Sequence, residues 1–232
     1  MMDIWIVLVM AHAYGDFLLQ TDGIAKNKHK VGYLALHVGI HGGLAYLLLQ
    51  QWHWWWVLPG VALPHALIDF VKSRCGSGSK AFAADQFAHL LLLGLSSWVI
   101  TLMMGGGITL DSLYFSQWLL IGAGFTTAVW GVGYFIREVV GEMCAENENL
   151  KAELGKGLKN GGAMIGKLER ALIFVFVAIG QPAGIGFLVA AKSILRFEEA
   201  KKQPLAEYVL IGTLWSFGLA LTIAYLTLNL VK

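Results

Sequence analysis

The feature that most constrains this chain is a series of long apolar blocks. They fall at residues 3–20, 31–51, 53–72, 83–104, 115–136, 163–180, 182–197 and 205–230. A helix needs roughly 17–25 mainly apolar residues to cross a bilayer. Charged residues make up 14% of the chain, whereas a soluble domain carries about 25%. The sequence therefore predicts an all-α polytopic membrane protein with about seven or eight transmembrane helices. It excludes a soluble enzyme, a nucleic-acid-binding module and a disordered chain.

Basic residues distinguish the connections between these blocks. They cluster in or beside the connections after the first, third and fifth blocks and before the last one: Lys26, Lys28, Lys30, Lys72, Arg74, Lys80, Arg137, Lys151, Lys156, Lys159, Lys167, Lys201 and Lys202. The alternate connections carry almost no charge. Because cytoplasmic loops are enriched in Lys and Arg, we expect the N-terminus outside and these loops in the cytoplasm. The first block lacks a basic start and a small-residue cleavage site, so we do not expect a cleaved signal peptide.

Two regions are expected along the chain. Residues 1–104 form a four-helix bundle, and residues 105–232 form further membrane helices with a cytoplasmic helical segment at about 138–160. Residues 163–197 are long for one helix, and Gly180-Gln181-Pro182 is a plausible break, since proline removes a backbone donor. Two short helices, a re-entrant hairpin and a single span remain open for this stretch.

The first four blocks contain a repeat of ionisable residues. His12 and Asp16 in the first block recur as His65 and Asp69 in the third. The pair His37 and His41 in the second block corresponds to Asp85 and His89 in the fourth. The recurrence in the same order and orientation predicts a tandem duplication of a helical hairpin.

These four pairs predict a metal site inside the bundle. Residues four apart lie on one helix face, and the alternating helix directions bring all eight groups to a similar depth on the cytoplasmic side. Intramembrane ionisable groups usually face the interior and mark function. Imidazoles and carboxylates without thiolates suit zinc, manganese or iron. We expect two divalent metal ions, zinc foremost, bound by His12, Asp16, His37, His41, His65, Asp69, Asp85 and His89.

Other polar residues have more than one interpretation. A single His-x-x-x-Asp pair in a membrane helix is commonly an interhelical hydrogen-bonding pair, so a structural polar network or a proton relay stays open as an alternative. Lys72 lies about one turn after Asp69. It either reaches an anionic substrate or reflects only the enrichment of basic residues in cytoplasmic loops. Arg170 and Lys192 are candidates to bind a phosphate or carboxylate, or to form ion pairs and snorkel.

The chain resembles an uncharacterised bacterial inner-membrane family, domain of unknown function 3307. The resemblance is carried by His12-Ala-Tyr-Gly-Asp16-Phe-Leu-Leu-Gln20-Thr-Asp22, His37 and His41, His65-Ala-Leu-Ile-Asp69, and Asp85-Gln-Phe-Ala-His89. Towards the C-terminus it is carried by Gly166-Lys-Leu-Glu169-Arg170, Gly180-Gln-Pro182, Ala191-Lys-Ser-Ile-Leu-Arg196 and Glu207-Tyr-Val-Leu-Ile-Gly212. More distantly, the chain is similar to small membrane proteins described as metal-dependent hydrolases. The resemblance implies a multi-pass protein of the bacterial inner membrane and no established reaction.

The sequence favours a dinuclear-metal membrane hydrolase that acts on a lipid-linked, amphipathic or anionic substrate from the cytoplasmic side. Asp16 or Asp85 is expected as general base, with Lys72 beside them. A divalent-metal transporter, a di-iron oxidase and a non-catalytic protein with a structural metal or polar site are the alternatives. The lipid bilayer is the expected partner, nucleic acid is not, and an oligomer is open.

Overall fold

The computed structural model describes residues 2–74, 76–105, 116–154, 160–195 and 203–231. These residues form helices joined by short connections, with no strand among them. The all-helical prediction is therefore confirmed for the described chain. Lys156, Lys159, Arg196, Lys201 and Lys202 lie outside the described residues. The helices group into two compact units, Met1–Thr126 and Thr127–Lys232.

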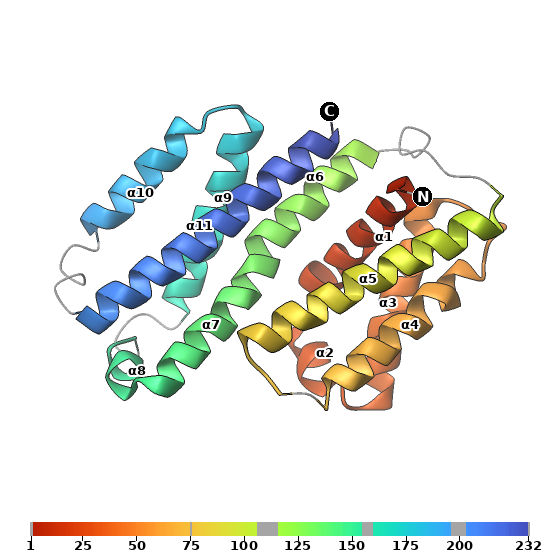
Figure 1. The fold of residues 1–232 in the computed structure, drawn as a ribbon, viewed down its shortest axis with the longest axis horizontal. Coiled ribbons are helices and arrows are strands. Elements are labelled where there is room, and N and C mark those ends of the chain that lie inside the picture. The colour runs from red at the N-terminus through yellow and green to blue at the C-terminus, as the bar shows by residue number, and fades with distance from the viewer. Residues whose placement is uncertain (1, 75, 106–115, 155–159, 196–202, 232) are drawn as a thin grey trace. The chain divides into compact units, whose positions relative to one another are not determined.

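Four long helices of the first unit contact one another in a closed circuit. The helices of this unit are α1 (Met2–Tyr14), continued by the π-helical turn η1 (Gly15–Leu19), α2 (Asp22–Asn27), α3 (Val31–Leu49), α4 (Val57–Lys72), α5 (Ser79–Met103) and α6 (Ser116–Thr126). Helix α1 contacts α3 and α5, and α4 contacts the same two helices. We call α1, α3, α4 and α5 the four-helix group (Figure 1). Helix α6 contacts α1 and so belongs with this unit.

The four-helix group turns its paired ionisable residues inward, and α5 carries large apolar side chains on its outer face. Asp85, His89 and Leu93, spaced four apart, are buried. Phe87 and Leu91 on the opposite face are 62% and 60% exposed. This arrangement is the reverse of a soluble helix, which buries its apolar stripe. It fits an environment of lipid around the helix.

Two connections differ from the expected boundaries. The third apolar block was expected from residue 53, but α4 begins at Val57, because residues 51–56 form turns. The amides of Trp54 and Val57 donate to the carbonyls of Gln51 and Trp54 in these turns. The connection after the first block contains α2, whose start is capped by the Thr21 hydroxyl accepting from Ile24 N.

The described residues of the second unit form five helices and a π-helical turn. These are η3 (Thr127–Gly131), α7 (Val132–Glu146), α8 (Glu148–Leu154), α9 (Gly161–Ala178), α10 (Ala183–Leu195) and α11 (Gln203–Val231). Helix α11 contacts α7, α8 and α9, and α10 contacts α9. The expected break in residues 163–197 is confirmed: α9 and α10 are separate helices, and Gly180 between them has a φ of 68°. The expected helical segment at 138–160 is divided between the end of α7 and α8.

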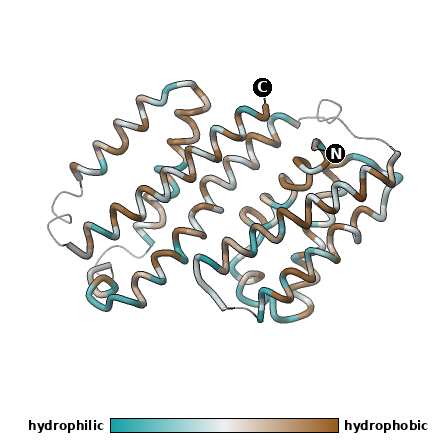
Figure 2. The backbone as a smooth tube through the Cα atoms, viewed as in Figure 1, coloured by the Kyte–Doolittle hydropathy of each residue, from teal (hydrophilic) through white to brown (hydrophobic). Residues whose placement is uncertain are grey.

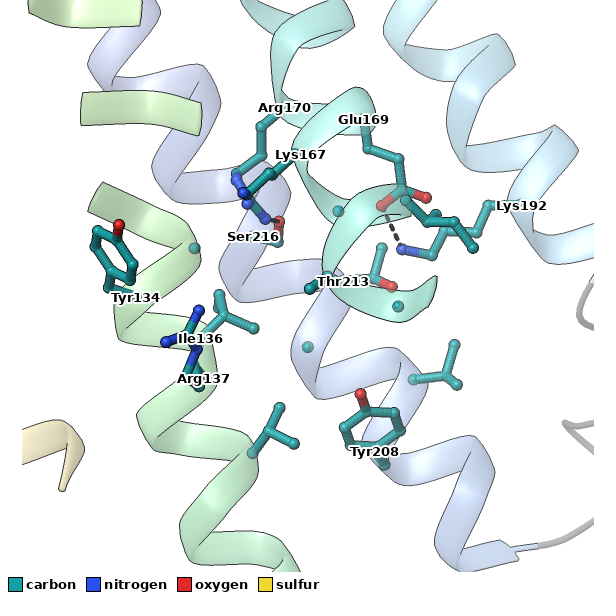
Figure 3. A pocket seen from close by; sticks show the side chains of 18 of the residues that line it. Tyr134, Ile136, Arg137, Lys167, Glu169, Arg170, Lys192, Tyr208, Thr213 and Ser216 are labelled. Atoms are coloured by element: carbon teal, nitrogen blue, oxygen red, sulfur yellow. Dashed lines mark hydrogen bonds and ion pairs between the residues drawn. The ribbon is translucent and has the colours of Figure 1, made fainter. Parts of the chain in front are cut away.

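A cavity of about 240 Å³ opens within the second unit, between α7, α9, α10 and α11 (Figure 3). Its lining combines Arg137, Lys167, Arg170 and Lys192 with apolar and aromatic side chains.

Among the described residues, five helices are long and apolar enough to cross a membrane. They are Met2–Leu19, Val31–Leu49, Ser79–Met103, Gln117–Glu146 and Leu205–Val231. Hydrophobic residues dominate the middles of these helices, and hydrophilic ones gather around α2 and the adjoining helix ends (Figure 2). The chain is thus a membrane protein by the length and composition of its helices. Helix α10 is apolar but shorter, at Ala183–Ile194.

The close approach of α3 and α4 yields a first prediction. A Cβ added at Gly42 would lie 2.6 Å from the carbonyl oxygen of Leu58, whereas one at Gly39 on the same helix would meet nothing within 4 Å. We expect Gly42→Ala to lower the free energy of unfolding by about 1–3 kcal/mol, since an overpacked contact forces the backbones apart. Gly39→Ala should be neutral or stabilise by up to about 1 kcal/mol. Denaturation of both variants in detergent measures their free energies of unfolding. Equal changes in the two variants would contradict the close contact between Gly42 and the backbone of Leu58.

Candidate functional site

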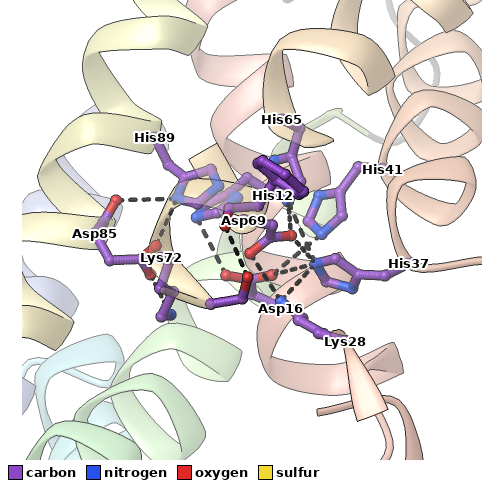
Figure 4. A network of polar contacts seen from close by, with 12 residues as sticks. His12, Asp16, Lys28, His37, His41, His65, Asp69, Lys72, Asp85 and His89 are labelled. Carbon is purple, nitrogen blue, oxygen red and sulfur yellow. Dashed lines mark hydrogen bonds and ion pairs between the residues drawn. The ribbon is translucent and has the colours of Figure 1, made fainter. Parts of the chain in front are cut away.

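The structure brings the eight repeated residues together in one buried cluster inside the four-helix group (Figure 4). Each is at most 7% exposed: His12, Asp16, His37, His41, His65, Asp69, Asp85 and His89. We call them the eight-residue cluster. Each helix of the group contributes two members, four residues apart, so one turn of every helix faces the centre. Their roles as metal ligands remain a prediction.

Local backbone features make room for the cluster. Asp16 lies in the π-helical turn η1, and single π-helical turns are common at functional sites. A Cβ added at Gly15 would lie within 2.7 Å of both nitrogens of the His41 ring. A glycine at this position therefore lets the His41 ring lie directly against α1.

The imidazole rings pack face to face or at a tilt. The ring centroids of His41 and His65 are 3.8 Å apart, and those of His65 and His89 are 4.3 Å apart. His12 stacks on His89 at 4.9 Å. Rings this close cannot all carry a proton at once without strong mutual repulsion. Neutral imidazoles, the form that binds metals, are therefore favoured for most of them.

His37 connects two of the carboxylates. Its Nε2 atom lies 3.3 Å from Asp16 Oδ1 and 3.1 Å from Asp69 Oδ2. Asp16 Oδ1 also lies 3.2 Å from His41 Nε2. One imidazole nitrogen facing two carboxylate oxygens needs positive charge there, which either a proton on the ring or a metal ion between the groups would supply.

Two lysines complete the charge balance of the cluster. Lys28 Nζ donates to Asp69 Oδ1 at 3.1 Å and lies 2.9 Å from His37 Nε2. Lys72 Nζ donates to Asp85 Oδ2 at 2.5 Å. The Lys72 side chain is 38% exposed, against 15% for Lys28. Lys72 therefore marks the side from which the cluster is reached.

Lys28 was not expected at this site. In the sequence it lies in a connection with Lys26 and Lys30. The enrichment of basic residues in cytoplasmic loops accounts for all three lysines and does not distinguish Lys28 from the other two. Its position as the C-cap residue directly after α2 brings its ammonium group to Asp69 and His37 of the cluster. The cap at Thr21, which starts α2, is the local signal that could have indicated this fold-back.

Gln86 links the two halves of the cluster. Its amide nitrogen donates to Asp16 Oδ2 at 3.3 Å and to Asp85 Oδ2 at 3.2 Å. Its amide oxygen lies 3.3 Å from His12 Nε2. The Gln86 amide thus donates hydrogen bonds to two carboxylates at once and adds no charge of its own to the cluster.

Several buried polar atoms of the cluster have no hydrogen-bond partner. The clearest is His89 Nε2, because His89 Nδ1 lies 2.9 Å from the backbone oxygen of Asp85. A histidine that donates one ring N–H to a carbonyl presents the lone pair of its other nitrogen, which is how metal-binding imidazoles are oriented. Asp85 Oδ1 is a second such atom, whereas Asp69 Oδ2 has His37 Nε2 at 3.1 Å. Buried atoms of this kind are rare unless a ligand or water satisfies them.

The potential ligand atoms form three overlapping groups, each within 4.8 Å: His12, Asp16, His41 and His65; His37, His65 and Asp69; and Asp69, Asp85 and His89. The first and third groups share no residue. They could hold one ion each, with His37 between them. The first offers four donors, the number of a closed tetrahedral site, and the third offers three, the number of a site with an open position.

Arg170 and Lys192 do not belong to this cluster. Both lie in the second unit and line its cavity. Lys192 Nζ donates to Glu169 Oε2 at 2.7 Å, so the ion pair considered from the sequence is present. Arg170 is buried and donates to Val129 O and Ser216 Oγ.

Comparison with known proteins identifies a family for the N-terminal part of the chain. The family model described as "Protein of unknown function (DUF3307)" matches residues 4–116. This confirms the resemblance drawn from the motifs of the first four helices. The match does not include the C-terminal motifs. No curated protein and no solved structure matches the chain.

The position of Gln86 yields a second prediction. Gln86→Glu would place a third carboxylate against Asp16 and Asp85, whereas Gln86→Leu only removes the amide. We expect Gln86→Leu to cost about 1–3 kcal/mol of stability in metal-free protein and Gln86→Glu to cost more. The Gln86→Glu variant should recover stability as pH falls, because protonation of a carboxyl removes the repulsion. Denaturation at neutral and mildly acidic pH measures both effects.

Gln181→Glu, in the exposed turn between α9 and α10, is the control for adding a carboxylate. A Gln86→Glu protein as stable as this control at neutral pH would contradict the assigned contacts.

Proposed function

We propose that the eight-residue cluster binds two divalent metal ions and that the protein is a metal-dependent membrane hydrolase. Its substrate would be lipid-linked or amphipathic and would enter from the cytoplasmic side. The observation that carries this proposal is the convergence of five imidazoles and three carboxylates in one buried cluster. The unpartnered Nε2 of His89, oriented by the carbonyl of Asp85, supports it independently.

The donor set fits zinc first, with manganese or iron as alternatives. Imidazole nitrogen and carboxylate oxygen without thiolate are typical ligands of these metals. In this proposal His12, Asp16, His41 and His65 hold one ion, and Asp69, Asp85 and His89 hold the other. When bound, such ions lower the pKa of a coordinated water and polarise a carbonyl or phosphoryl oxygen.

The chain's own residues supply the remaining functions. Asp16 and Asp85 both face the Gln86 amide, and either carboxylate is placed to accept a proton from a water in the cluster. Lys72 is the partly exposed cation beside Asp85. A lysine at the opening of a buried site favours anionic substrates, and we propose that it binds the substrate's negative group.

The proposal includes the finer topology. Helices α4, α9 and α10 would cross or enter the membrane with the five long apolar helices, which gives seven or eight membrane helices. The paired ligands of α1 and α4, and of α3 and α5, are consistent with a duplicated hairpin. The cluster lies near the helix ends that adjoin the basic residues Lys28 and Lys72, which supports a cytoplasmic opening, an external N-terminus and a bacterial inner membrane.

A specific observation favours a second candidate function. Three carboxylates, two lysines and one protonated imidazole give a cluster with no net charge and no metal. Lys28 Nζ lies within hydrogen-bonding distance of both Asp69 and His37, where a cation is needed. The cluster could therefore be a structural network or a proton relay in which Lys28 takes the place of a metal ion.

Metal content of the purified protein is the first test. We expect about two zinc, manganese or iron ions per chain by elemental mass spectrometry. His41→Ala should lose about one ion and His89→Ala about one, because they belong to separate ligand groups; Asp16→Ala and Asp69→Ala should behave likewise. His29→Ala and His53→Ala, both exposed, are controls that should keep both ions. Folded protein without stoichiometric metal would overturn the proposal.

Hydrolytic activity is the second test. Metal-loaded protein is expected to turn over a member of phosphoester, ester or amide substrate panels presented in micelles. Lys72→Gln should raise KM for anionic substrates by about tenfold or more, the loss expected for one charge-assisted contact, and should leave neutral substrates unaffected. Absence of turnover in metal-loaded protein across all three panels would reject the hydrolase and leave the metal site to a transporter or a structural role.

Lys28→Met separates the two candidate functions. Removing the ammonium group leaves Asp69 and His37 without their cation, so metal-free Lys28→Met protein should lose about 1.5–3 kcal/mol of stability. If metal ions bind the cluster, added zinc should restore the loss, and the variant should bind zinc at least as tightly as the parent. If the cluster is a metal-free network, zinc should restore nothing. Lys26→Met, exposed on the same helix, is the matched control.

A further inference from the structure

The cavity of the second unit has a lining with excess positive charge. Arg137, Lys167, Arg170 and Lys192 line it, and Glu169 is the one carboxylate among the lining residues that the structure describes. Lys192 Nζ and Glu169 Oε2 form an ion pair at 2.7 Å (Figure 3). Glu169 is also close enough to Arg170 to act on its charge, so one carboxylate is shared by two cations and the lining has three more cations than carboxylates.

Arg170 is held rigidly at the inner end of the cavity. Its Nε and Nη2 donate to the carbonyl oxygen of Val129 at 3.1 and 2.8 Å, and its Nη1 donates to Ser216 Oγ at 3.1 Å. Val129 lies in the π-helical turn η3. A Cβ at Gly133 would lie 2.6 Å from Nη2, so this glycine leaves the space that the guanidinium fills.

These partners orient the Arg170 guanidinium but do not neutralise it. Arg170 is 4% exposed, and both of its acceptors are uncharged. A buried charge that lacks an opposite charge is costly. The one carboxylate that acts on Arg170, Glu169, is already paired with Lys192, so an anion in the cavity would supply the opposite charge that is missing.

Arg137 and Lys167, which are exposed and half-buried respectively, lie over aromatic rings of the lining. The Arg137 guanidinium is 5.3 Å from the centre of the Tyr134 ring, and Lys167 Nζ is 6.0 Å from the centre of the Trp130 ring. Cation–π contacts hold a cation in place while leaving its N–H donors free to bind an anion. Thr213 adds a hydroxyl group to the lining.

The size and depth of the cavity match a phosphate headgroup rather than a whole lipid. Its volume is about 240 Å³, below the roughly 300–1,000 Å³ of pockets for drug-sized ligands. Its lining runs from Gly162, next to the first residue of α9, to Arg170, about 12 Å along the helix at 1.5 Å per residue. That length covers most of one half of a hydrocarbon core about 30 Å thick.

We propose that this cavity binds a phosphate group, with Arg137 and Lys167 as its direct donors and Arg170 as the fixed charge behind them. The group is either the headgroup of an anionic lipid or a free phosphate. The site is separate from the metal-binding proposal and does not depend on it.

The test is ligand-dependent thermal stabilisation of the full chain in a neutral detergent. The probes are dioctanoyl phosphatidic acid, dioctanoylglycerol as the same lipid without phosphate, and inorganic phosphate. We expect phosphatidic acid to raise the melting temperature in a saturable way and dioctanoylglycerol to have no such effect. Stabilisation by inorganic phosphate as well assigns the site to phosphate in general, and stabilisation by phosphatidic acid alone assigns it to a lipid headgroup.

Two pairs of variants locate the binding. Lys167→Gln should weaken phosphatidic acid binding about tenfold or more, and Lys151→Gln, whose lysine pairs with Glu148 outside the cavity, should not. Gly212→Leu should abolish binding by filling the cavity, since a Cβ at Gly212 meets nothing within 4 Å. Gly186→Leu, equally unobstructed but not in the lining, should leave it unchanged.

Equal stabilisation of the parent and of Gly212→Leu by phosphatidic acid would overturn the site. So would equal stabilisation of the parent by phosphatidic acid and dioctanoylglycerol, or no stabilisation by any phosphate probe. Metal loss from the eight-residue cluster leaves these outcomes unchanged, so the two proposals fail separately.

Discussion

An ionised carboxylate within a membrane must find its compensating charge inside the protein, and the first unit is arranged around this constraint. Each such group costs roughly 2.5–3.5 kcal/mol near the bilayer centre on insertion scales, and the four-helix group buries Asp16, Asp69 and Asp85. Lipid offers no hydrogen bonds or counter-ions. The three carboxylates can therefore be stable only where imidazoles, lysines or metal ions surround them, which is the interior of the group.

Much of the site followed from the sequence because the same constraint acts on residue spacing. Pairs four apart place two groups on one helix face, and antiparallel helices return to one depth. On α5, the spacing of the residues alone predicts that Asp85 and His89 face inward and that Phe87 and Leu91 face outward. Contacts between residues far apart in the chain were harder to predict from the sequence. The ammonium of Lys28 reaches Asp69 only because α2 folds back, and a loop lysine carries no periodicity that would indicate this.

Other elements were unpredictable for similar reasons. Hydropathy treats the tryptophans before Val57 as part of an apolar block, yet residues 51–56 form turns, because an indole ring suits an interface as well as a helix. The association of α6 with α1 involves Tyr14, whose hydroxyl donates to Leu119 O at 2.7 Å. That contact is specific to the packed chain. Likewise the two carbonyl and hydroxyl acceptors of Arg170 become visible only once α9 and α11 are packed.

The two units present the same electrostatic problem with opposite sign. The eight-residue cluster has three carboxylates against two lysines, so its missing charge is positive. The cavity of the second unit has four cations against one carboxylate, so its missing charge is negative. In water such imbalances are screened at little cost, but in a low-dielectric interior they select a ligand of the opposite sign. The sign of the uncompensated charge thus points to a cation for the first unit and an anion for the second. The degree to which protonation of an imidazole can replace the cation decides how strongly a metal ion is required.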